Sequence, residues 1–562
     1  MNRHQRSATT TKSATATEPA AASPQSSPPT TTTSTTATTT TATTTTTSTT
    51  TTTRPAKKLQ YFIYPELPKY ELRFYIAVII ICIFYSWNAV FTASNTFLHS
   101  RFDPYHKTVT NFPLIGPRFK DTSNWEWARW APFAISMIPF LAIHSLIFSI
   151  CSKFLTPLTT SYISLIYSMI GCCYLFTLRL VAISVLQGTF IFAVTLYLRH
   201  QLTVWLCAGP LLYFIMNWST RISHDPFLVL LFAAYTLLSY ISYNLDFVRG
   251  EAQTQNQTVH YRYQRMLFYT FYPPYMISLI VPYSDFEKQI ADRDKRVRNW
   301  RWILFFAARI LFWWGFIDFM LHFSYHEALL FDTTYANTIP KDQFVSLGMA
   351  LGQFFNLKYV VIFGLPAVFA HIDKMQPQDG PICIARVTLY SKIWRNFDRG
   401  LYTFFKRYIF IPICQPTFSL GRKLIGVFVS YAFVLIWHGI QYHNIVWILL
   451  NIAELFVEYT AKGIYLIDGV RKFRETYISD VAFRRILAWL QIIPFVFGIY
   501  SNFYFLGGPS VGALFVQRIW VEETLTLQYP FFLLISLGYC YANITMEVEN
   551  YLTRRQQKLH EA

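Results

Sequence analysis

The stretch Ser430–Gly439, which reads SYAFVLIWHG, places one histidine, His438, at the end of an apolar run of membrane length. An ionisable side chain at membrane depth is costly, so such a residue marks a candidate functional site. A neutral imidazole can accept a proton near physiological pH, which makes His438 a candidate general base. The alternative is a buried histidine that only bonds a neighbouring helix, and the spacing does not choose between the two.

This apolar run is one of a series. The chain has 562 residues, of which 53% are hydrophobic and 18% aromatic, and apolar runs of about 18 or more residues recur along it. We therefore expect an all-α polytopic membrane protein, a helical bundle with about 10–12 membrane segments, some of them re-entrant. The expected spans lie near residues 73–94, 130–151, 160–180, 182–199, 203–219, 226–246, 300–322, 343–370, 423–441, 443–462, 484–506 and 526–546.

Residues 268–286 differ from the expected spans because Pro273 and Pro274 stand in tandem there. Two prolines in succession break a helix. Broken backbone at membrane depth survives only where protein or a cavity satisfies its polar groups. The pattern predicts a re-entrant segment near an active cavity, with a kinked span as the alternative.

The formal net charge of the chain is +18. Its basic residues gather at the ends of the expected spans, as in residues 286–298, which we expect to be cytosolic and to face anionic lipid. No nucleic-acid motif accompanies them. Residues 1–57 hold too few large apolar side chains to fold and are predicted to be a disordered tail. Residues 58–552 form the expected membrane domain, and 553–562 a basic tail.

A polar, aromatic block precedes His438 by about 40 residues. It spans Trp394–Gly400, reads WRNFDRG, and holds one carboxylate, Asp398. On a helix, Trp394 and Asp398 would share a face because they are four residues apart, which would place an aromatic lid beside the carboxylate. The alternatives are a salt bridge from Asp398 to Arg395 or Arg399 and a place for Trp394 in an interfacial aromatic belt.

The order of these motifs resembles the membrane-bound O-acyltransferase family. The resemblance is closest to its hedgehog acyltransferase branch, strongly over about residues 380–545 and more weakly over about 225–370, whereas residues 1–60 have no counterpart. Gly439 after His438 favours this branch, because the glycerol-uptake branch tends to have an acidic residue there. The motifs that carry it are Cys383-Ile384, Trp394–Leu401, Arg407–Pro412, Trp437–Gly439, Ser501–Gly508, Val511-Gly512 and Gly538–Tyr541.

The resemblance implies an enzyme that transfers palmitate from palmitoyl-CoA to the N-terminal cysteine amine of a secreted signalling protein. It implies a multi-pass enzyme in the membrane of the endoplasmic reticulum or the Golgi. The resemblance makes His438 and Asp398 the catalytic pair, Trp394 the gate of the acyl-CoA pocket, Asn502 a substrate-binding residue of the core, and Cys383 the ligand of a haem b iron. The expected partners are acyl-CoA, the secreted acceptor and membrane lipids, and not nucleic acid.

The residues themselves leave some of these roles open. The eight cysteines form no paired metal pattern and no disulfide framework, so Cys383 can equally be structural or lipidated. Asn502 can bond a substrate or a neighbouring helix. A desolvated histidine stays neutral and can take the proton of an attacking amine. Asp398 could orient that imidazole, bind the substrate ammonium or carry a second proton.

Three other functions are considered. The first is an acyltransferase of this family with a lipid or glycerol-type acceptor. The second is a non-catalytic regulator of the same family, which the presence of both His438 and Asp398 disfavours. The third is a transporter or channel, which the lack of an internal repeat and of paired interrupted helices disfavours.

Overall fold

The computed structural model describes residues 63–100, 107–112, 116–223, 225–251, 257–524 and 528–561. Within these residues, 12 helices are long and apolar enough to cross a membrane, so the predicted polytopic helical fold is confirmed. The predicted N-terminal tail, 1–57, lies outside the described residues. The spanning helices are α1 Lys69–Ser100, α2 Trp125–Phe154, α3 Pro157–Phe176, α4 Leu178–Leu198, α5 Gln201–Ile222, α6 Pro226–Val229 continued by α7 Tyr235–Val248, α11 Trp300–Leu321, α14 Lys341–Ile372, α18 Leu420–His438, α19 Tyr442–Tyr465, α21 Asp480–Phe515 and α22 Tyr529–Glu561.

Short helices and one β-hairpin connect these spans. The hairpin pairs β1 and β2 antiparallel, with Lys107 opposite Asp121, and the sequence analysis did not anticipate it. The connecting elements are β1 Lys107–Phe112, β2 Gly116–Asp121, α8 Val259–Thr270, α9 Pro273–Met276, α10 Tyr283–Ala291, α12 His326–Phe331, α13 Thr333–Ala336, α15 Tyr390–Asn396, α16 Arg399–Phe405, α17 Ile411–Cys414 and α20 Asp468–Tyr477.

Side chains cap the first turns of several spans. Asn124 accepts the N–H of Trp127 at the start of α2, and Ser479 accepts the N–H of Ala482 at the start of α21. The first four N–H groups of a helix have no partner within it. In a membrane an unsatisfied N–H is expensive, so these caps fix where a span begins.

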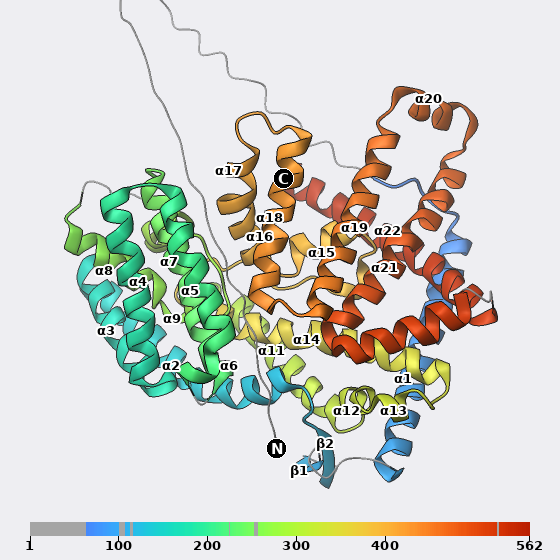
Figure 1. Cartoon of the computed structure of the whole chain (residues 1–562), viewed down its shortest axis with the longest axis horizontal. Helices are drawn as coiled ribbons and strands as arrows, with labels where there is room; N and C mark the ends of the chain where they lie inside the picture. The colour runs from blue at the N-terminus through green and yellow to red at the C-terminus, as the bar shows by residue number, and fades with distance from the viewer. Residues whose placement is uncertain are drawn as a thin grey trace, which may run out of the picture. The chain divides into compact units, whose positions relative to one another are not determined.

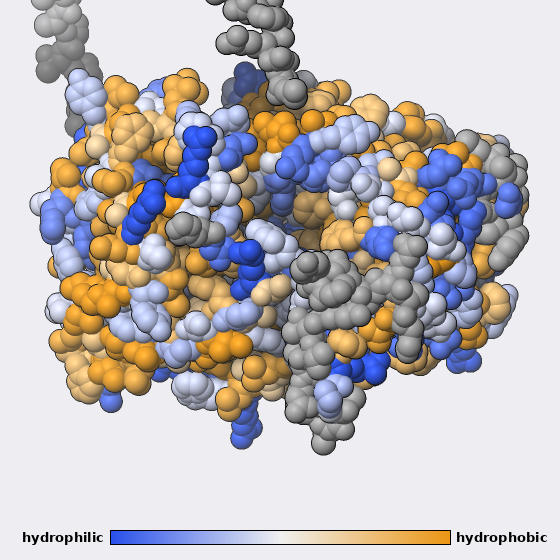
Figure 2. All heavy atoms as spheres, turned by 60° about the horizontal axis from the view of Figure 1, so that its bottom comes forward, coloured by the Kyte–Doolittle hydropathy of each residue, from blue (hydrophilic) through white to orange (hydrophobic). Residues whose placement is uncertain are grey.

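The long helix α14 joins two groups of helices (Figure 1). It contacts α2 and α9 of the first group and α21 of the second, and it also packs against α1 and α11. The first group holds α2 to α5 and α7 to α9, and the second holds α15 to α22. The outer helices of the first group expose large apolar side chains such as Ile170, Leu186 and Leu206, which suit contact with lipid. Figure 2 shows many hydrophobic side chains over this first group, at the left, and a hollow near the middle of the face.

The segment with the tandem prolines is broken and buried. Helix α8 ends at Thr270, α9 begins at Pro273, and residues 268–284 are buried throughout. No described helix in this segment is long enough to cross a membrane, which excludes the kinked span. Protein groups satisfy the freed backbone. Tyr283 N–H donates to Ser242 Oγ at 2.8 Å, and Ser284 N–H donates to an Asp246 carboxylate oxygen at 2.9 Å.

Candidate active site

His438 is held at the end of α18 with its imidazole between two aromatic rings. Gly439 ends the helix with φ +91, and the Asn444 amide donates to the carbonyl oxygens of His438 and Gly439, at 2.8 and 2.9 Å. The ring centroid lies 5.3 Å from that of Trp447 and 5.0 Å from that of Phe505, edge to face with both.

The imidazole of His438 keeps its nitrogens available. The residue is half-buried, and no described residue hydrogen-bonds its ring. A histidine that only bonded a neighbouring helix would have such a partner, so the geometry favours a reactive role. Phe505 and Trp447 stack on each other with centroids 4.2 Å apart and form an apolar wall beside the ring.

Asp398 caps α16 and is not on the helix of Trp394. Helix α15 ends at Asn396, Asp398 has extended φ/ψ of −116° and 91°, and its carboxylate accepts the N–H of Leu401 at 2.8 Å. The prediction of one shared helix face is therefore wrong. An aspartate that bonds a backbone N–H ahead of it starts a new helix more readily than it continues the preceding one.

The carboxyl group of Asp398 is largely desolvated. Its burial raises its pKa to about 6, although the N–H groups of Leu401 and Gly400 oppose the shift. Arg399 instead pairs with Asp379, at 2.8 Å, and no described ion pair joins Asp398 to Arg395 or Arg399. The salt-bridge alternative is thus excluded for the described residues, and a carboxyl group that titrates near pH 6 can carry a proton.

Trp394 is an interior residue rather than a belt tryptophan. Its indole Nε1–H donates to Asn451 Oδ1 at 2.9 Å. Its ring stacks on Trp447, with centroids 5.9 Å apart, and meets Tyr431 edge to face. Because Trp447 also packs on His438, Trp394 is one aromatic ring away from the histidine.

Aromatic side chains connect the surroundings of His438 to Asp398. Phe505, which contacts His438, packs on Phe355 with centroids 5.9 Å apart, and Phe355 stacks on Phe397 at 5.1 Å. Phe397 directly precedes Asp398 in the chain. The structure thus brings the two predicted residues to one aromatic cluster, but no described hydrogen bond or ion pair joins them.

A third ionisable group, Glu126, reaches this region and was missed by the sequence analysis. It lies in the first turn of α2 and pairs with Lys358 at 2.5 Å. It also accepts the Tyr359 hydroxyl at 2.9 Å and lies within electrostatic range of His438. A carboxylate at the entrance of an apolar run was the available signal.

Asn502 lies half-buried in α21. It precedes Phe505 by three residues, so the two side chains project from neighbouring positions of one helix face. No described residue hydrogen-bonds the Asn502 side chain. Its amide is therefore free of the helix–helix bond that was the alternative.

Cys383 is exposed on the loop between α14 and α15. A thiolate-bound haem needs an accessible thiol, which Cys383 offers, and an apolar slot for the macrocycle, which no described contact of Cys383 forms. Two nearby bonds hold the loop backbone instead, Tyr541 O–H to Ile384 O at 3.2 Å and Ile384 N–H to Asn356 Oδ1 at 3.4 Å. The surroundings of Cys383 therefore do not fit a haem group.

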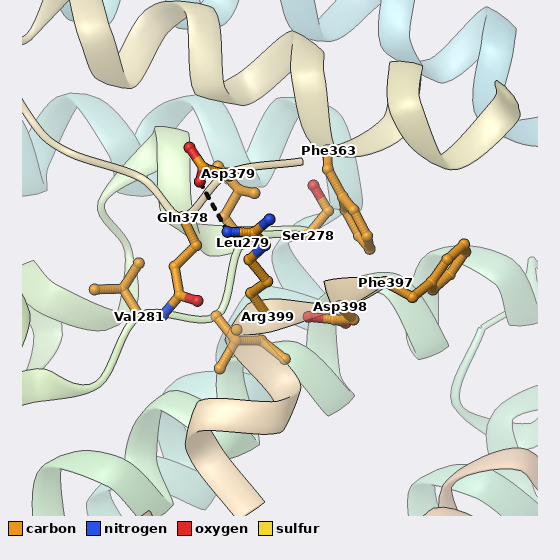
Figure 3. A pocket seen from close by; sticks show the side chains of 11 residues that line it. Ser278, Leu279, Val281, Phe363, Gln378, Asp379, Phe397, Asp398 and Arg399 are labelled. Atoms are coloured by element: carbon orange, nitrogen blue, oxygen red, sulfur yellow. Dashed lines mark hydrogen bonds and ion pairs between the residues drawn. The ribbon is translucent and has the colours of Figure 1, made fainter. Parts of the chain in front are cut away.

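A pocket opens beside Asp398 (Figure 3). Its walls come from the broken segment, α14, the loop after α14 and the start of α16, and they include Ser278, Ile280, Phe363, Gln378 and Asp398. Gly400 lets these walls approach, because a Cβ on it would lie 2.5 Å from the Ile280 carbonyl oxygen. The broken segment therefore forms one side of the space next to the carboxylate.

Comparisons with known proteins show which chains this one is similar to. The protein-cysteine N-palmitoyltransferase HHAT of Mus musculus is 27% identical over 450 residues, which cover 77% of this chain and 89% of that protein. The protein-cysteine N-palmitoyltransferase Rasp of Drosophila melanogaster is 26% identical over 426 residues, 72% of this chain and 81% of that protein. The membrane-bound O-acyltransferase GUP1 of Saccharomyces cerevisiae is 23% identical over 303 residues, 48% of this chain and 51% of that protein.

The family model of the membrane-bound O-acyltransferases matches residues 153–503. This range covers more than half of the chain and contains Asp398, His438 and Asn502. The chain belongs to the membrane-bound O-acyltransferase family.

Proposed function

We propose that this chain transfers palmitate from palmitoyl-CoA to the α-amine of an N-terminal cysteine on a secreted, hedgehog-like signalling protein. The choice of a protein acceptor over a lipid acceptor rests on one observation. The two relatives named protein-cysteine N-palmitoyltransferases align over most of both chains, whereas the yeast acyltransferase GUP1 aligns over about half. The half-buried imidazole of His438, with no bonded partner among the described residues, supports the activity itself.

The reaction needs a neutral amine. An α-amino group has a pKa of about 7.7–8.0, so most of it is protonated at neutral pH. His438 accepts the ammonium proton before or during attack, and such base catalysis contributes on the order of 10²–10⁴-fold. The amine nitrogen then bonds to the thioester carbonyl carbon and gives up its second proton, the carbon–sulfur bond breaks, and the CoA sulfur leaves with that proton. The first proton passes from His438 to solvent.

The other residues of the cluster position the two substrates. The apolar wall of Trp447 and Phe505 covers part of the imidazole surface. Ionised Asp398 supplies negative charge that attracts the substrate ammonium, and Trp394 gates the acyl chain. Holding two reactants together can contribute roughly 7–11 kcal/mol to lowering the barrier.

The proposed location is the membrane of the endoplasmic reticulum. Palmitoyl-CoA is made available in the cytosol, whereas a secreted acceptor is in the lumen. An enzyme that joins them needs a cavity reached from both sides, and a bundle with a buried broken segment can enclose one.

The test is acyl transfer by the purified full chain. Palmitoyl-CoA and a synthetic peptide with an N-terminal cysteine are the substrates, and the same peptide with an acetylated α-amine is the control. We expect transfer to the free amine only, and a loss of at least about 100-fold in His438→Ala. His443→Ala, in the first turn of α19, is the matched control and should keep full activity.

The alternatives have distinct outcomes. Transfer to a lipid or glycerol acceptor, and not to the peptide, would replace the proposal with the lipid-acylating activity. Binding of palmitoyl-CoA without transfer to either acceptor would support a non-catalytic regulator. Unchanged transfer in His438→Ala would remove the histidine from the mechanism.

A further inference from the structure

Tyr235 lies beside the proposed catalytic pair, and the reaction described above gives it no role. Its ring meets the ring of Trp437, the residue before His438, edge to face with centroids 5.4 Å apart. Its hydroxyl lies within electrostatic range of the carboxylates of Asp398 and Glu126. Helix α7 thus brings a tyrosine hydroxyl to the region that holds both carboxylates and the histidine.

The backbone before Tyr235 is irregular. A single π-helical turn, Leu230–Ala234, joins α6 to α7 directly before this residue. Such a turn holds one extra residue, which rotates the side chains that follow it, and it is frequent at functional sites. Residues 231–234 and 236–238 are buried, whereas Tyr235 keeps part of its surface accessible. A substrate can therefore reach Tyr235 within an otherwise buried segment.

Acyl transfer from a thioester needs a donor for the oxygen that becomes negative. When the amine attacks, the π electrons of the carbonyl move onto its oxygen, and a hydrogen bond to that oxygen lowers the barrier. The other two groups of the site have different tasks, because Asp398 attracts the ammonium and His438 takes its proton. The reaction thus requires a further donor.

Two donors of this region are already engaged. Lys358 pairs with Glu126 at 2.5 Å, and the Tyr359 hydroxyl donates to the same carboxylate at 2.9 Å. By contrast, no described residue accepts the hydrogen of the Tyr235 hydroxyl. The Asn502 amide is also free among the described residues, and it was assigned above to substrate binding. A phenol is neutral, so it can donate to an oxyanion without cancelling the charge that attracts the ammonium.

We propose that the Tyr235 hydroxyl donates a hydrogen bond to the carbonyl oxygen of the acyl donor and stabilises the oxyanion that forms there. The amine nitrogen bonds to the carbonyl carbon, and the π electron pair moves to the oxygen. When the carbon–sulfur bond breaks, that pair re-forms the carbonyl, and Tyr235 keeps its proton throughout. The proposal rests on the proposed function for its thioester donor, and it holds for a peptide or a lipid acceptor.

The first experiment measures steady-state transfer from palmitoyl-CoA by the purified full chain carrying Tyr235→Phe. Phenylalanine keeps the ring that packs on Trp437 and removes only the hydroxyl. We expect kcat to fall about 100-fold, the effect of losing one oxyanion donor, with KM of both substrates unchanged. Tyr240→Phe is the matched control and should keep full activity. It removes a hydroxyl from the same helix, but its ring packs against α4, where a Cβ on Gly188 would lie 2.2 Å from it.

A second experiment detects contact with the carbonyl and needs no acyl transfer. It compares the binding of two unreactive donors by calorimetric titration in detergent. One is S-hexadecyl-CoA, a thioether without a carbonyl, and the other is S-(2-oxoheptadecyl)-CoA, a ketone whose oxygen can accept a hydrogen bond. We expect Tyr235→Phe to weaken binding of the ketone about fivefold, the effect of one neutral hydrogen bond, and to leave binding of the thioether unchanged.

The two experiments distinguish a failure of this proposal from a failure of the proposed function. If the chain acylated a lipid and not the peptide, Tyr235→Phe would still slow that transfer about 100-fold. If the chain acylated neither acceptor, the comparison of ketone and thioether would still test the contact between Tyr235 and the carbonyl.

Three outcomes would overturn the proposal. Full transfer by Tyr235→Phe would remove the hydroxyl from the reaction. Equal losses of affinity for the ketone and the thioether would make Tyr235 a structural residue. A raised KM for the acceptor, with unchanged affinity for both donors, would assign the hydroxyl to the acceptor instead.

Discussion

Asp398 has two separable roles at the scale of the single residue. Its carboxylate accepts the Leu401 N–H at the start of α16, and its burial keeps its pKa at about 6. Asparagine caps a helix about as well as aspartate, whereas alanine loses roughly 1 kcal/mol at such a position. Asparagine cannot, however, ionise or hold a proton for transfer.

We therefore expect Asp398→Asn to keep the thermal stability of the protein and to lose transfer by about 100-fold. Asp398→Ala should lose transfer and also be less stable by about 1 kcal/mol. The measurements are peptide palmitoylation and thermal unfolding in detergent. If Asp398→Asn retained nearly full transfer, the residue would be a helix cap and no more.

The buried carboxyl group of Glu327 should make the stability of the protein depend on pH. It is buried in α12, Asn124 donates to its Oε1 at 2.5 Å, and burial raises its pKa to about 7 despite the opposing charge of Lys358. An unfolded glutamate has a pKa of about 4.3. Between these two values the folded state holds a proton that the unfolded state has lost, so stability falls as pH rises through this window.

Glu327→Gln should remove that fall, because glutamine mimics the protonated acid. We expect the variant to be more stable than the unsubstituted protein at pH 8, by a few kcal/mol at about 1.4 kcal/mol per unit of pKa shift, and equal to it near pH 4.5. Thermal unfolding across this pH range measures the difference. Glu475→Gln, at an exposed position on α20, should show no such dependence. If the difference in stability between Glu327→Gln and the unsubstituted protein did not change with pH, the raised pKa of Glu327 would be contradicted.

At the scale of elements, hydropathy predicts the spans well. The expected span 423–441 corresponds to α18, Leu420–His438, and the expected span 484–506 lies within α21, Asp480–Phe515. An apolar run of membrane length is a local property of the sequence. The ends shift because they depend on single caps, such as Ser419 and Ser479.

Two features of these elements could not be predicted from the sequence. The break between α15 and α16 depends on one bond, from Leu401 N–H to Asp398, and four-residue spacing cannot reveal it. The fit of α16 against the broken segment depends on Gly400, where a Cβ would meet the Ile280 carbonyl oxygen. Both depend on atoms that are near in space, whereas periodicity reports only neighbours along one helix.

At the scale of the whole molecule, the candidate site draws on distant parts of the chain. His438 could be found from its place at the end of an apolar run. Its surroundings could not, because Glu126, Phe355 and Phe505 lie on α2, α14 and α21. The helix α14 packs against both α2 and α21 and so brings these residues together.

Arg484 ties the ends of the described chain together. This residue of α21 is fully buried, and its guanidinium donates to the Pro65 carbonyl at 2.7 Å, to Glu547 at 2.9 Å and to the Asn543 carbonyl at 3.0 Å. It thus bonds the segment before α1 and two turns of α22. The next residue, Arg485, has an exposed side chain and pairs with the more buried Glu71 at 2.7 Å.

Arg484→Met should therefore cost about 3 kcal/mol of stability, because it leaves Glu547 and two carbonyl groups without their donor. Arg485→Met should cost less, about 1 kcal/mol, since the Arg485 side chain is itself partly solvated and Glu71 keeps the hydrogen bond from the Tyr75 hydroxyl. Thermal unfolding of the two variants in detergent, with proteolysis of the segment before α1 as a second readout, separates them. Similar losses in both would mean that the three bonds of Arg484 do not hold the ends together. A loss confined to Arg484→Met would show that this buried arginine couples the first and last spans.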